Sequence, residues 1–260
     1  RRERGQMMEK IIAIVNQKGG VGKTTTAVNL GAALSDSGKR VLLVDLDPQG
    51  SLTTSLGVDV AQEDTTAYEL LKGDKPAQEV IRHMKRGYDL IPGDLRLTGI
   101  EKGSNDVVGR EYLLKEALEG VTGAYDYILI DCSPSLGVLS LNALTACGGV
   151  LIPTQAEYLA LTGLAQLTQT IAVARRRLNP ALTIAGVVMT MYDKRRNLTA
   201  AVEGRLGELF PGKLCATRIR CNVALAEAPT QGADIFAYDP RSNGAKDYQA
   251  LADELTEKEQ

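Results

Sequence analysis

The architecture of this chain follows from nine residues near its start, Gln17-Lys18-Gly19-Gly20-Val21-Gly22-Lys23-Thr24-Thr25. They stand between the apolar run 10–15 and a helical pattern that begins at Lys23. Glycines let the backbone N–H groups of such a loop turn inward around phosphate oxygens, and the start of a helix adds partial positive charge. Lys23 can reach the β- and γ-phosphates, and the Thr24 hydroxyl can ligate Mg²⁺. The stretch predicts a site for ATP and Mg²⁺, formed by Lys18, Gly19, Gly20, Val21, Gly22, Lys23, Thr24 and Thr25.

The same order of apolar run, turn and helical pattern repeats along the chain. Several runs are nearly continuous in Ile, Val and Leu, as in strands that are covered on both faces. The alternation predicts an α/β fold, with a mostly parallel twisted sheet flanked by helices on both faces. Strands are expected at 10–15, 40–44, 88–91, 127–130, 150–152, 184–189 and 214–219. Helices are expected at 23–37, 112–119, 136–145, 158–178, 198–210 and 245–258.

No linker or repeat interrupts this pattern, so one domain is expected over residues 8–260. Residues 1–7 are interpreted as a cloning remnant or a disordered start. The four cysteines have no metal-binding spacing, and the single His83 cannot anchor a zinc site. No run reaches the ~18 apolar residues of a membrane span, and no signal peptide is visible. These features predict a cytoplasmic protein.

The charge is unevenly distributed. The whole chain has a net charge of −2, but residues 171–222 contain ten Lys or Arg and only three Asp or Glu, a local charge of +7. This segment indicates a basic face, with a solvated helix surface as the alternative.

The loop departs from the general phosphate-binding pattern G-x-x-x-x-G-K-[ST], because Gln17 stands at the first glycine and Lys18 adds a second lysine. In this it resembles the deviant Walker A motif of the P-loop NTPases that include partition, Min and nitrogenase iron proteins. The stretch 11–57, with Asp45-Leu46-Asp47-Pro48-Gln49-Gly50, is similar to the ParA/Soj ATPases that partition chromosomes and plasmids. The similarity continues through Asp131-Cys132-Ser133-Pro134-Ser135, Glu227-Ala228-Pro229 and Tyr238-Asp239-Pro240-Arg241-Ser242.

The resemblance implies roles for the acids. At the position of Asp47, the family has a carboxylate that holds or activates the attacking water, which makes Lys18, Lys23 and Asp47 the expected catalytic residues. Asp131 ends an apolar strand, as a Walker B aspartate does, and is expected to hold Mg²⁺ together with Thr24. Asp45 is either a support behind these groups or a strand-end cap.

Lys18 is implied to cross a dimer interface to the phosphates bound by the partner subunit, as an arginine finger does. An exposed lysine beside the loop is the alternative. If the trans role holds, ATP joins two subunits face to face and acts as the ligand of a two-state switch.

The turn 191–197 is basic, and the family has an arginine near this turn that binds DNA without sequence preference. Arg195 is the nearest match, and Lys194 and Arg196 are expected to share the contact; a charged exposed turn is the alternative. Further along, Cys221 and Ala224 stand at positions that are usually basic. We expect two more arginines to compensate, and an asparagine to contact the nucleotide base: Arg218, Arg220 and Asn222.

The expected function is DNA partitioning by a slow ATP hydrolase. The resemblance implies that this enzyme forms an ATP-dependent homodimer and associates with the nucleoid. A ParB-like centromere-binding protein is expected to stimulate its hydrolysis. A MinD-like membrane-associated regulator of cell division is the main alternative, against which the acidic residues 254–260 argue. An iron–sulfur carrier would require a cysteine pattern that Cys132 and Cys147 do not provide. A P-loop metabolic kinase would require an acceptor-binding lid that the sequence does not suggest.

Overall fold

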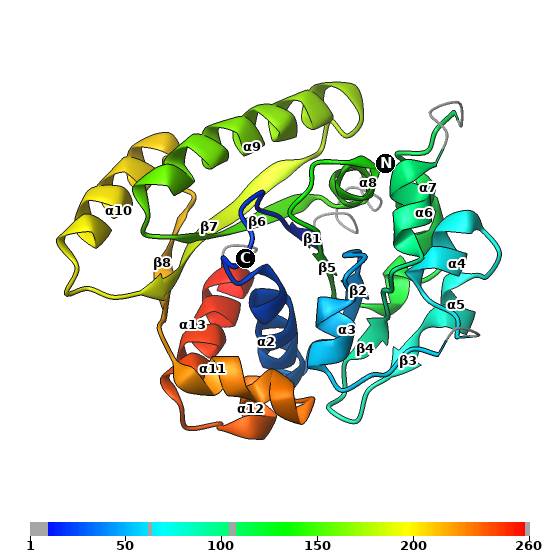
Figure 1. The fold of residues 1–260 in the computed structure, drawn as a ribbon, viewed down its shortest axis with the longest axis horizontal. Helices are drawn as coiled ribbons and strands as arrows, with labels where there is room; N and C mark the ends of the chain where they lie inside the picture. Colours follow the sequence, from blue (N-terminus) through cyan, green and yellow to red (C-terminus); the bar gives the residue numbers. More distant parts are fainter. Residues whose placement is uncertain (1–9, 62–63, 104–107, 258–260) are drawn as a thin grey trace.

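An eight-stranded sheet runs through the middle of the protein in this computed structural model (Figure 1). The structure describes residues 10–61, 64–103 and 108–257, so the predicted leader 1–7 lies outside the described residues. The strands lie in the order β3-β4-β2-β5-β1-β6-β7-β8, and all neighbours are parallel except β3 and β4. The predicted α/β fold with a mostly parallel sheet is confirmed.

All seven predicted strands are present. The bounds are β1 Ile11–Ile14, β2 Val41–Asp45, β3 Arg82–His83, β4 Asp89–Ile91, β5 Tyr127–Asp131, β6 Gly149–Gln155, β7 Thr183–Tyr192 and β8 Leu214–Arg220. Strand β3 has no counterpart among the predictions, because two residues are too few to show a periodic pattern.

The central strands divide their apolar side chains between two cores. In β1, Ile11 and Ala13 belong to one buried cluster, whereas Ile12 and Ile14 belong to the other. Successive side chains of a strand point to opposite faces, so a sheet that is covered on both sides needs an apolar residue at every position. This explains why the runs are continuous rather than alternating.

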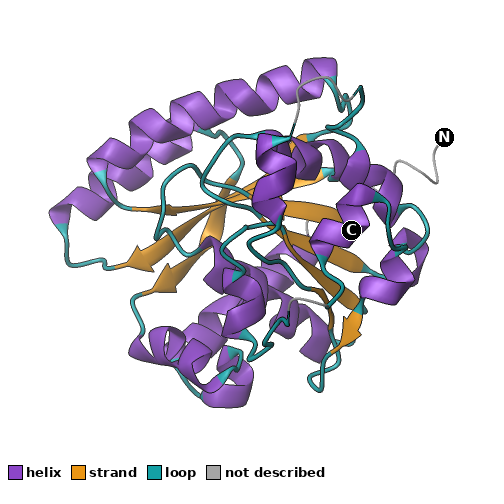
Figure 2. Ribbon diagram, turned by 45° about the vertical axis from the view of Figure 1, so that its right-hand side comes forward, coloured by secondary structure: helices purple, strands orange, loops and turns teal. Residues whose placement is uncertain are grey.

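Helices form a layer on each face of the sheet (Figure 2). Their bounds are α2 Lys23–Asp36, α3 Ser51–Ser55, α4 Ala67–Lys72, α5 Ala77–Val80, α6 Leu97–Lys102, α7 Leu113–Leu118, α8 Val138–Ala146, α9 Tyr158–Arg177, α10 Asn197–Leu209, α11 Val223–Glu227, α12 Ile235–Tyr238 and α13 Asn243–Glu257, with 3₁₀ turns η1 Thr122–Ala124 and η2 Ala228–Gln231. Helices α4, α7, α8, α9 and α10 bury their apolar side chains in the first core, and α2, α3 and α13 in the second. Within the described ranges, no helix has both the length and the apolar character needed to cross a membrane.

The six predicted helices are present, with ends that differ by at most two residues. The helices without a prediction are α3, α4, α5, α6, α11 and α12, each four to six residues long. Such helices span fewer than two turns, so a 3.6-residue period cannot be recognised in them.

The outer strand β8 is held by carboxylates of α13. The backbone N–H groups of Ala216 and Thr217 donate to Glu254 at 2.7 and 2.8 Å, and that of Arg220 donates to Asp247 at 2.9 Å. An edge strand otherwise presents unpaired backbone donors. These side chains therefore cover part of the open edge of the sheet.

Candidate nucleotide-binding site

The loop between β1 and α2 is shaped by two glycines and two strand ends. Gly20 and Gly22 have φ angles of 73° and 86°, the left-handed region that favours glycine. The Thr190 hydroxyl at the end of β7 donates to the carbonyl of Val21 at 2.8 Å. The Gln155 amide at the end of β6 donates to the carbonyl of Gly20, also at 2.8 Å. Side chains at the ends of β6 and β7 thus hold two carbonyl groups of the curved loop in place.

Lys23 lies at the first position of α2 with only 8% of its surface exposed. Its ammonium donates to the carbonyl of Lys18 across the loop at 3.3 Å. Burial lowers the pKa of Lys23, and the negative charge of Asp131 acts in the opposite direction. A buried cation at the start of a helix attracts an anion strongly, as the predicted phosphate contact requires.

Asp131 ends β5 and faces Thr24. The Thr24 hydroxyl donates to Asp131 Oδ2 at 2.7 Å, and Asp131 Oδ1 is buried without a hydrogen-bond partner among the described residues. Burial, followed by the nearby charge of Asp45, raises the pKa of Asp131 well above its usual value. An unsatisfied buried carboxylate beside a hydroxyl supplies oxygen ligands of the kind that Mg²⁺ prefers. The two residues therefore fit the predicted metal site.

Asp47 lies just beyond the end of β2 and is half-buried. Its Oδ1 accepts the backbone N–H of Gln49 at 2.9 Å. In the sheet register, Asp45 and Asp131 are direct neighbours on β2 and β5, so the loop that carries Asp47 starts beside the metal-ligand candidate. The structure thus brings Asp47 and Asp131 to the same edge of the sheet as the phosphate loop.

Asp45 is more deeply buried and makes more hydrogen bonds than the sequence indicates. It is fully buried, and burial is the main reason that its pKa rises to about 6. Its carboxylate accepts hydrogen bonds from the backbone of Asp47 and from Thr53. The signal available in the sequence was an acid at the end of an otherwise apolar strand.

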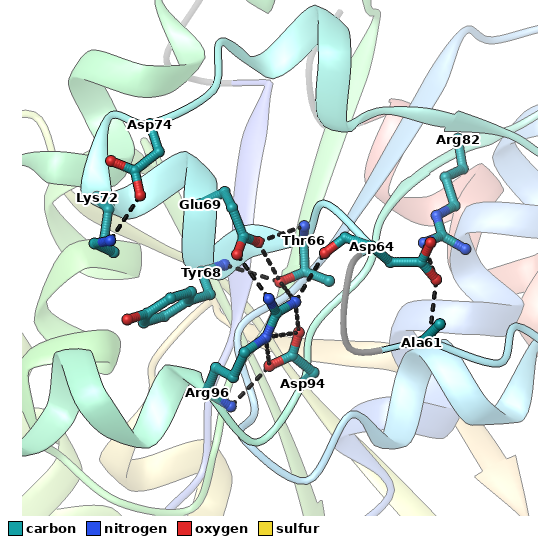
Figure 3. A network of polar contacts seen from close by, with 10 residues as sticks. All are labelled: Ala61, Asp64, Thr66, Tyr68, Glu69, Lys72, Asp74, Arg82, Asp94 and Arg96. Atoms are coloured by element: carbon teal, nitrogen blue, oxygen red, sulfur yellow. Dashed lines mark hydrogen bonds and ion pairs between the residues drawn. The ribbon is translucent and has the colours of Figure 1, made fainter.

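The loop after β4 lies beside Asp45. A network of polar contacts around Arg96 holds this loop in place (Figure 3). Arg96 donates to both carboxylate oxygens of Asp94, to Glu69 at 2.7 Å and to the carbonyl of Asp64 at 2.9 Å. The guanidinium also lies 5.5 Å from the ring centre of Tyr68. Such a network ties α4 and the start of α6 to the carboxyl end of β4.

Lys18 contacts a residue that sequence reasoning did not single out. Its ammonium lies 2.5 Å from Glu157 Oε2, just before α9, and the two side chains are 38% and 48% exposed. An exposed ion pair of this kind contributes about 0.2–1 kcal/mol and exchanges easily. Lys18 is therefore held at the surface of the chain by a contact that another anion can replace.

A cavity of about 130 Å³ opens beside the loop. Its lining includes Gly22, Thr25, Met191, Asn222 and Tyr248. Asn222 also caps α11, with its side-chain oxygen accepting the N–H of Leu225 at 3.3 Å. The predicted base contact thus lines a cavity together with two residues of the phosphate loop.

The predicted basic residues form two groups. Lys194 and Arg196 are exposed and make no ion pair within the described chain. Three arginines are each paired with a carboxylate: Arg195 with Asp193, Arg218 with Glu203, and Arg220 with Asp247. The pairings of Arg218 and Arg220 could not be predicted from the sequence, because Glu203 and Asp247 lie 15 and 27 residues away from them.

A second cavity, of about 330 Å³, brings part of this set together. Lys194 and Arg195 line it from the turn after β7, and Arg220 and Cys221 line it from the end of β8. Arg220 and Cys221 also line the cavity beside the phosphate loop. The basic turn is therefore a direct neighbour of the candidate nucleotide site, whereas Arg218 lies outside both linings.

The chain matches known proteins over most of its length. Residues 9–184 match the family model of an AAA domain. The chain is 49% identical to the sporulation initiation inhibitor protein Soj of Bacillus subtilis, over 95% of this chain and 98% of that protein. It is 45% identical to the chromosome partitioning protein ParA of Caulobacter vibrioides, over 96% and 95% of the two chains.

Among solved structures, one described as cobyrinic acid a,c-diamide synthase of Mycobacterium smegmatis with bound ADP and magnesium is 38% identical. It superposes with a TM-score of 0.84, covering 96% of this chain and 94% of that one. The likeness to Soj and ParA over nearly the full length confirms the resemblance seen in the motifs, and the chain belongs to the ParA/Soj family of P-loop ATPases.

Proposed function

We propose that this chain partitions DNA by an ATP-driven cycle of dimerisation, non-specific DNA binding and release. The observation that carries the proposal is the adjacency of the phosphate loop and the basic turn, whose two cavities share Arg220 and Cys221. Nucleotide chemistry at one cavity can therefore affect the neighbouring cationic surface. A ParB-like partner would stimulate hydrolysis and reset the cycle on the nucleoid.

The protein is an ATP hydrolase that uses Mg²⁺. Lys23 and the loop amides would bind the phosphates, and Thr24 and Asp131 would hold the ion. When bound, Mg²⁺ neutralises charge on the β- and γ-phosphates. Asp47 would orient and activate the attacking water, and Asn222 would contact the base.

Dimerisation would depend on Lys18. In the single chain its ammonium is paired with Glu157, an exposed contact that the more negative triphosphate of a partner subunit can displace. Each subunit would thus complete the phosphate site of the other.

Lys18→Gln is expected to leave ATP binding by the monomer nearly unchanged but to prevent the stable ATP dimer and stimulated hydrolysis. The reason is that the lost charge acts on phosphates bound by the other subunit. Light scattering with ATP and with ADP measures the dimer, and calorimetry measures ATP affinity. Glu157→Gln is the matched control, because it removes the intrachain partner and keeps Lys18. If Lys18→Gln dimerises as well as the wild type, the trans role is wrong.

DNA binding would require the dimer, since one subunit offers few phosphate contacts. Arg195→Glu combined with Arg196→Glu is expected to abolish binding to any duplex while ATP-driven dimerisation continues. Wild-type affinity should fall by about 0.9 log units per log unit of salt for each phosphate neutralised. A fluorescent random duplex, tested with ATP and with ADP at two salt concentrations, measures this.

The matched control is Lys10→Glu with Lys39→Glu, which changes the charge equally at two exposed lysines near the amino ends of β1 and β2. Its DNA binding should remain. Equal DNA binding by the Arg195/Arg196 variant would move the contact to other cations, such as Arg218 and Arg220. Binding by the wild type in ADP as strong as in ATP would contradict the proposed cycle.

A further inference from the structure

We infer that Asp45 is a positioning residue for ATP hydrolysis, because its buried carboxylate fixes the loop that carries Asp47. This inference rests on the role proposed above for Asp47. Asp45 itself is fully buried and acts through its neighbours.

The carboxylate of Asp45 ties both ends of one short loop together. Its Oδ1 accepts the backbone N–H of Asp47 at 3.1 Å. Its Oδ2 accepts the backbone N–H of Thr53 at 2.9 Å and the hydroxyl of Thr53 at 2.7 Å. One side chain therefore connects the start of the loop with the first turn of α3.

The Thr53 hydroxyl extends this clamp to β4. It accepts the N–H of Gly93 at 2.9 Å. Gly93 must be a glycine here, since a Cβ would lie 2.6 Å from the carbonyl oxygen of Asp45. Gly50, with φ of 61°, also lies close to Gly93, and a Cβ on it would lie 2.9 Å from the Gly93 carbonyl oxygen. The Asp47 loop is thus packed against the end of β4 at two points and hydrogen-bonded there at a third.

The chemistry of this contact requires a carboxylate. Three donors converge on Asp45: two backbone N–H groups and one hydroxyl. Only a side chain that accepts at both terminal atoms satisfies all three. Asparagine has the same shape, but its amide N–H₂ would face a donor. Asp45→Asn therefore loosens the loop with little change in volume, and Thr53→Val does so from the other side by removing the hydroxyl.

If the clamp positions Asp47, loosening it should slow the chemical step without weakening the nucleotide site. We expect kcat of Asp45→Asn and of Thr53→Val to fall by about 10²-fold, the effect of a displacement of roughly 1 Å in a reacting group. KM for ATP should stay near the wild-type value, and the ATP dimer should persist for longer. Thr53→Ser retains the hydroxyl and should restore most of the rate. Thr54→Val is the matched control, because Thr54 is an exposed threonine on the same helix. This variant should hydrolyse ATP at the wild-type rate.

The decisive comparison is Asp45→Asn in an Asp47→Ala background, measured by single-turnover hydrolysis of Mg·ATP. A residue that acts only through Asp47 adds no further loss once Asp47 is gone, so the double variant should be no slower than Asp47→Ala alone. Additive losses would overturn the inference, as would a normal kcat in both clamp variants. Loss of ATP affinity in Asp45→Asn and Thr53→Val together would assign the clamp to stability of the site instead. A wild-type rate in Asp47→Ala would refute the role of Asp47 itself, a failure that is distinct from the other outcomes.

Discussion

Lys23→Ala is expected to abolish tight binding of Mg·ATP. The Lys23 ammonium is held inside the loop by the carbonyl of Lys18, where a γ-phosphate would replace or join that contact. A charge-assisted hydrogen bond contributes about 1.5–3 kcal/mol, so its loss alone weakens binding by roughly 10- to 150-fold. The loop also loses the side chain that spans it, which should add to the effect. Titration calorimetry with Mg·ATP measures the dissociation constant.

The control for this experiment is Lys39→Ala. Lys39 is exposed and lies beyond the other end of α2, so its removal changes the net charge equally at a distance from the loop. Circular dichroism and thermal unfolding should show that both variants fold. An unchanged dissociation constant for Lys23→Ala would refute the assignment of the phosphate loop.

Asp47→Ala is expected to bind ATP normally and to hydrolyse it about 10²- to 10⁴-fold more slowly, the usual contribution of a general base. Lys23, Thr24 and Asp131 remain in place, so the nucleotide is still bound. Dimers formed with ATP should therefore accumulate and persist. Size-exclusion chromatography with light scattering follows the dimer, and phosphate release follows turnover.

Asp47→Asn separates the chemical role of this residue from its structural role. Asparagine can still accept the N–H of Gln49, which Asp47 Oδ1 accepts at 2.9 Å, but it cannot take a proton from water. A slow Asp47→Asn enzyme would therefore identify the missing base as the cause. Turnover at the wild-type rate in both variants would show that another residue activates the water.

Much of the fold could be predicted because its strands and long helices leave strong local patterns. The run around Ile11–Ile14 is apolar at every position, which is typical of a strand between two helical layers. The 20 residues of α9 show a helical period over several turns. By contrast, the helices α3 and α11 have five residues each, and their formation depends on contacts with distant segments.

The sequence by itself determined the phosphate loop, since its function resides in the spacing of glycines, lysine and hydroxyls along nine adjacent residues. It also placed Asp47 and Asp131, because Asp131 is the last residue of β5, Asp47 follows β2 by two residues, and parallel strands end at the same edge of a sheet. These features are local, or they follow from the parallel order of the strands.

Only the tertiary structure decided which side chains meet across long separations. Lys18 and Glu157 are 139 residues apart, and Arg220 and Asp247 are 27 residues apart. Asp45 meets Gly93 through Thr53, although these residues belong to separate segments of the chain. Such pairings depend on strand order, helix placement and side-chain direction together. A charged or polar residue gives no local indication of a partner far along the chain, so neither the pairing of Arg220 with Asp247 nor the contact of Thr53 with Gly93 could be predicted from local sequence.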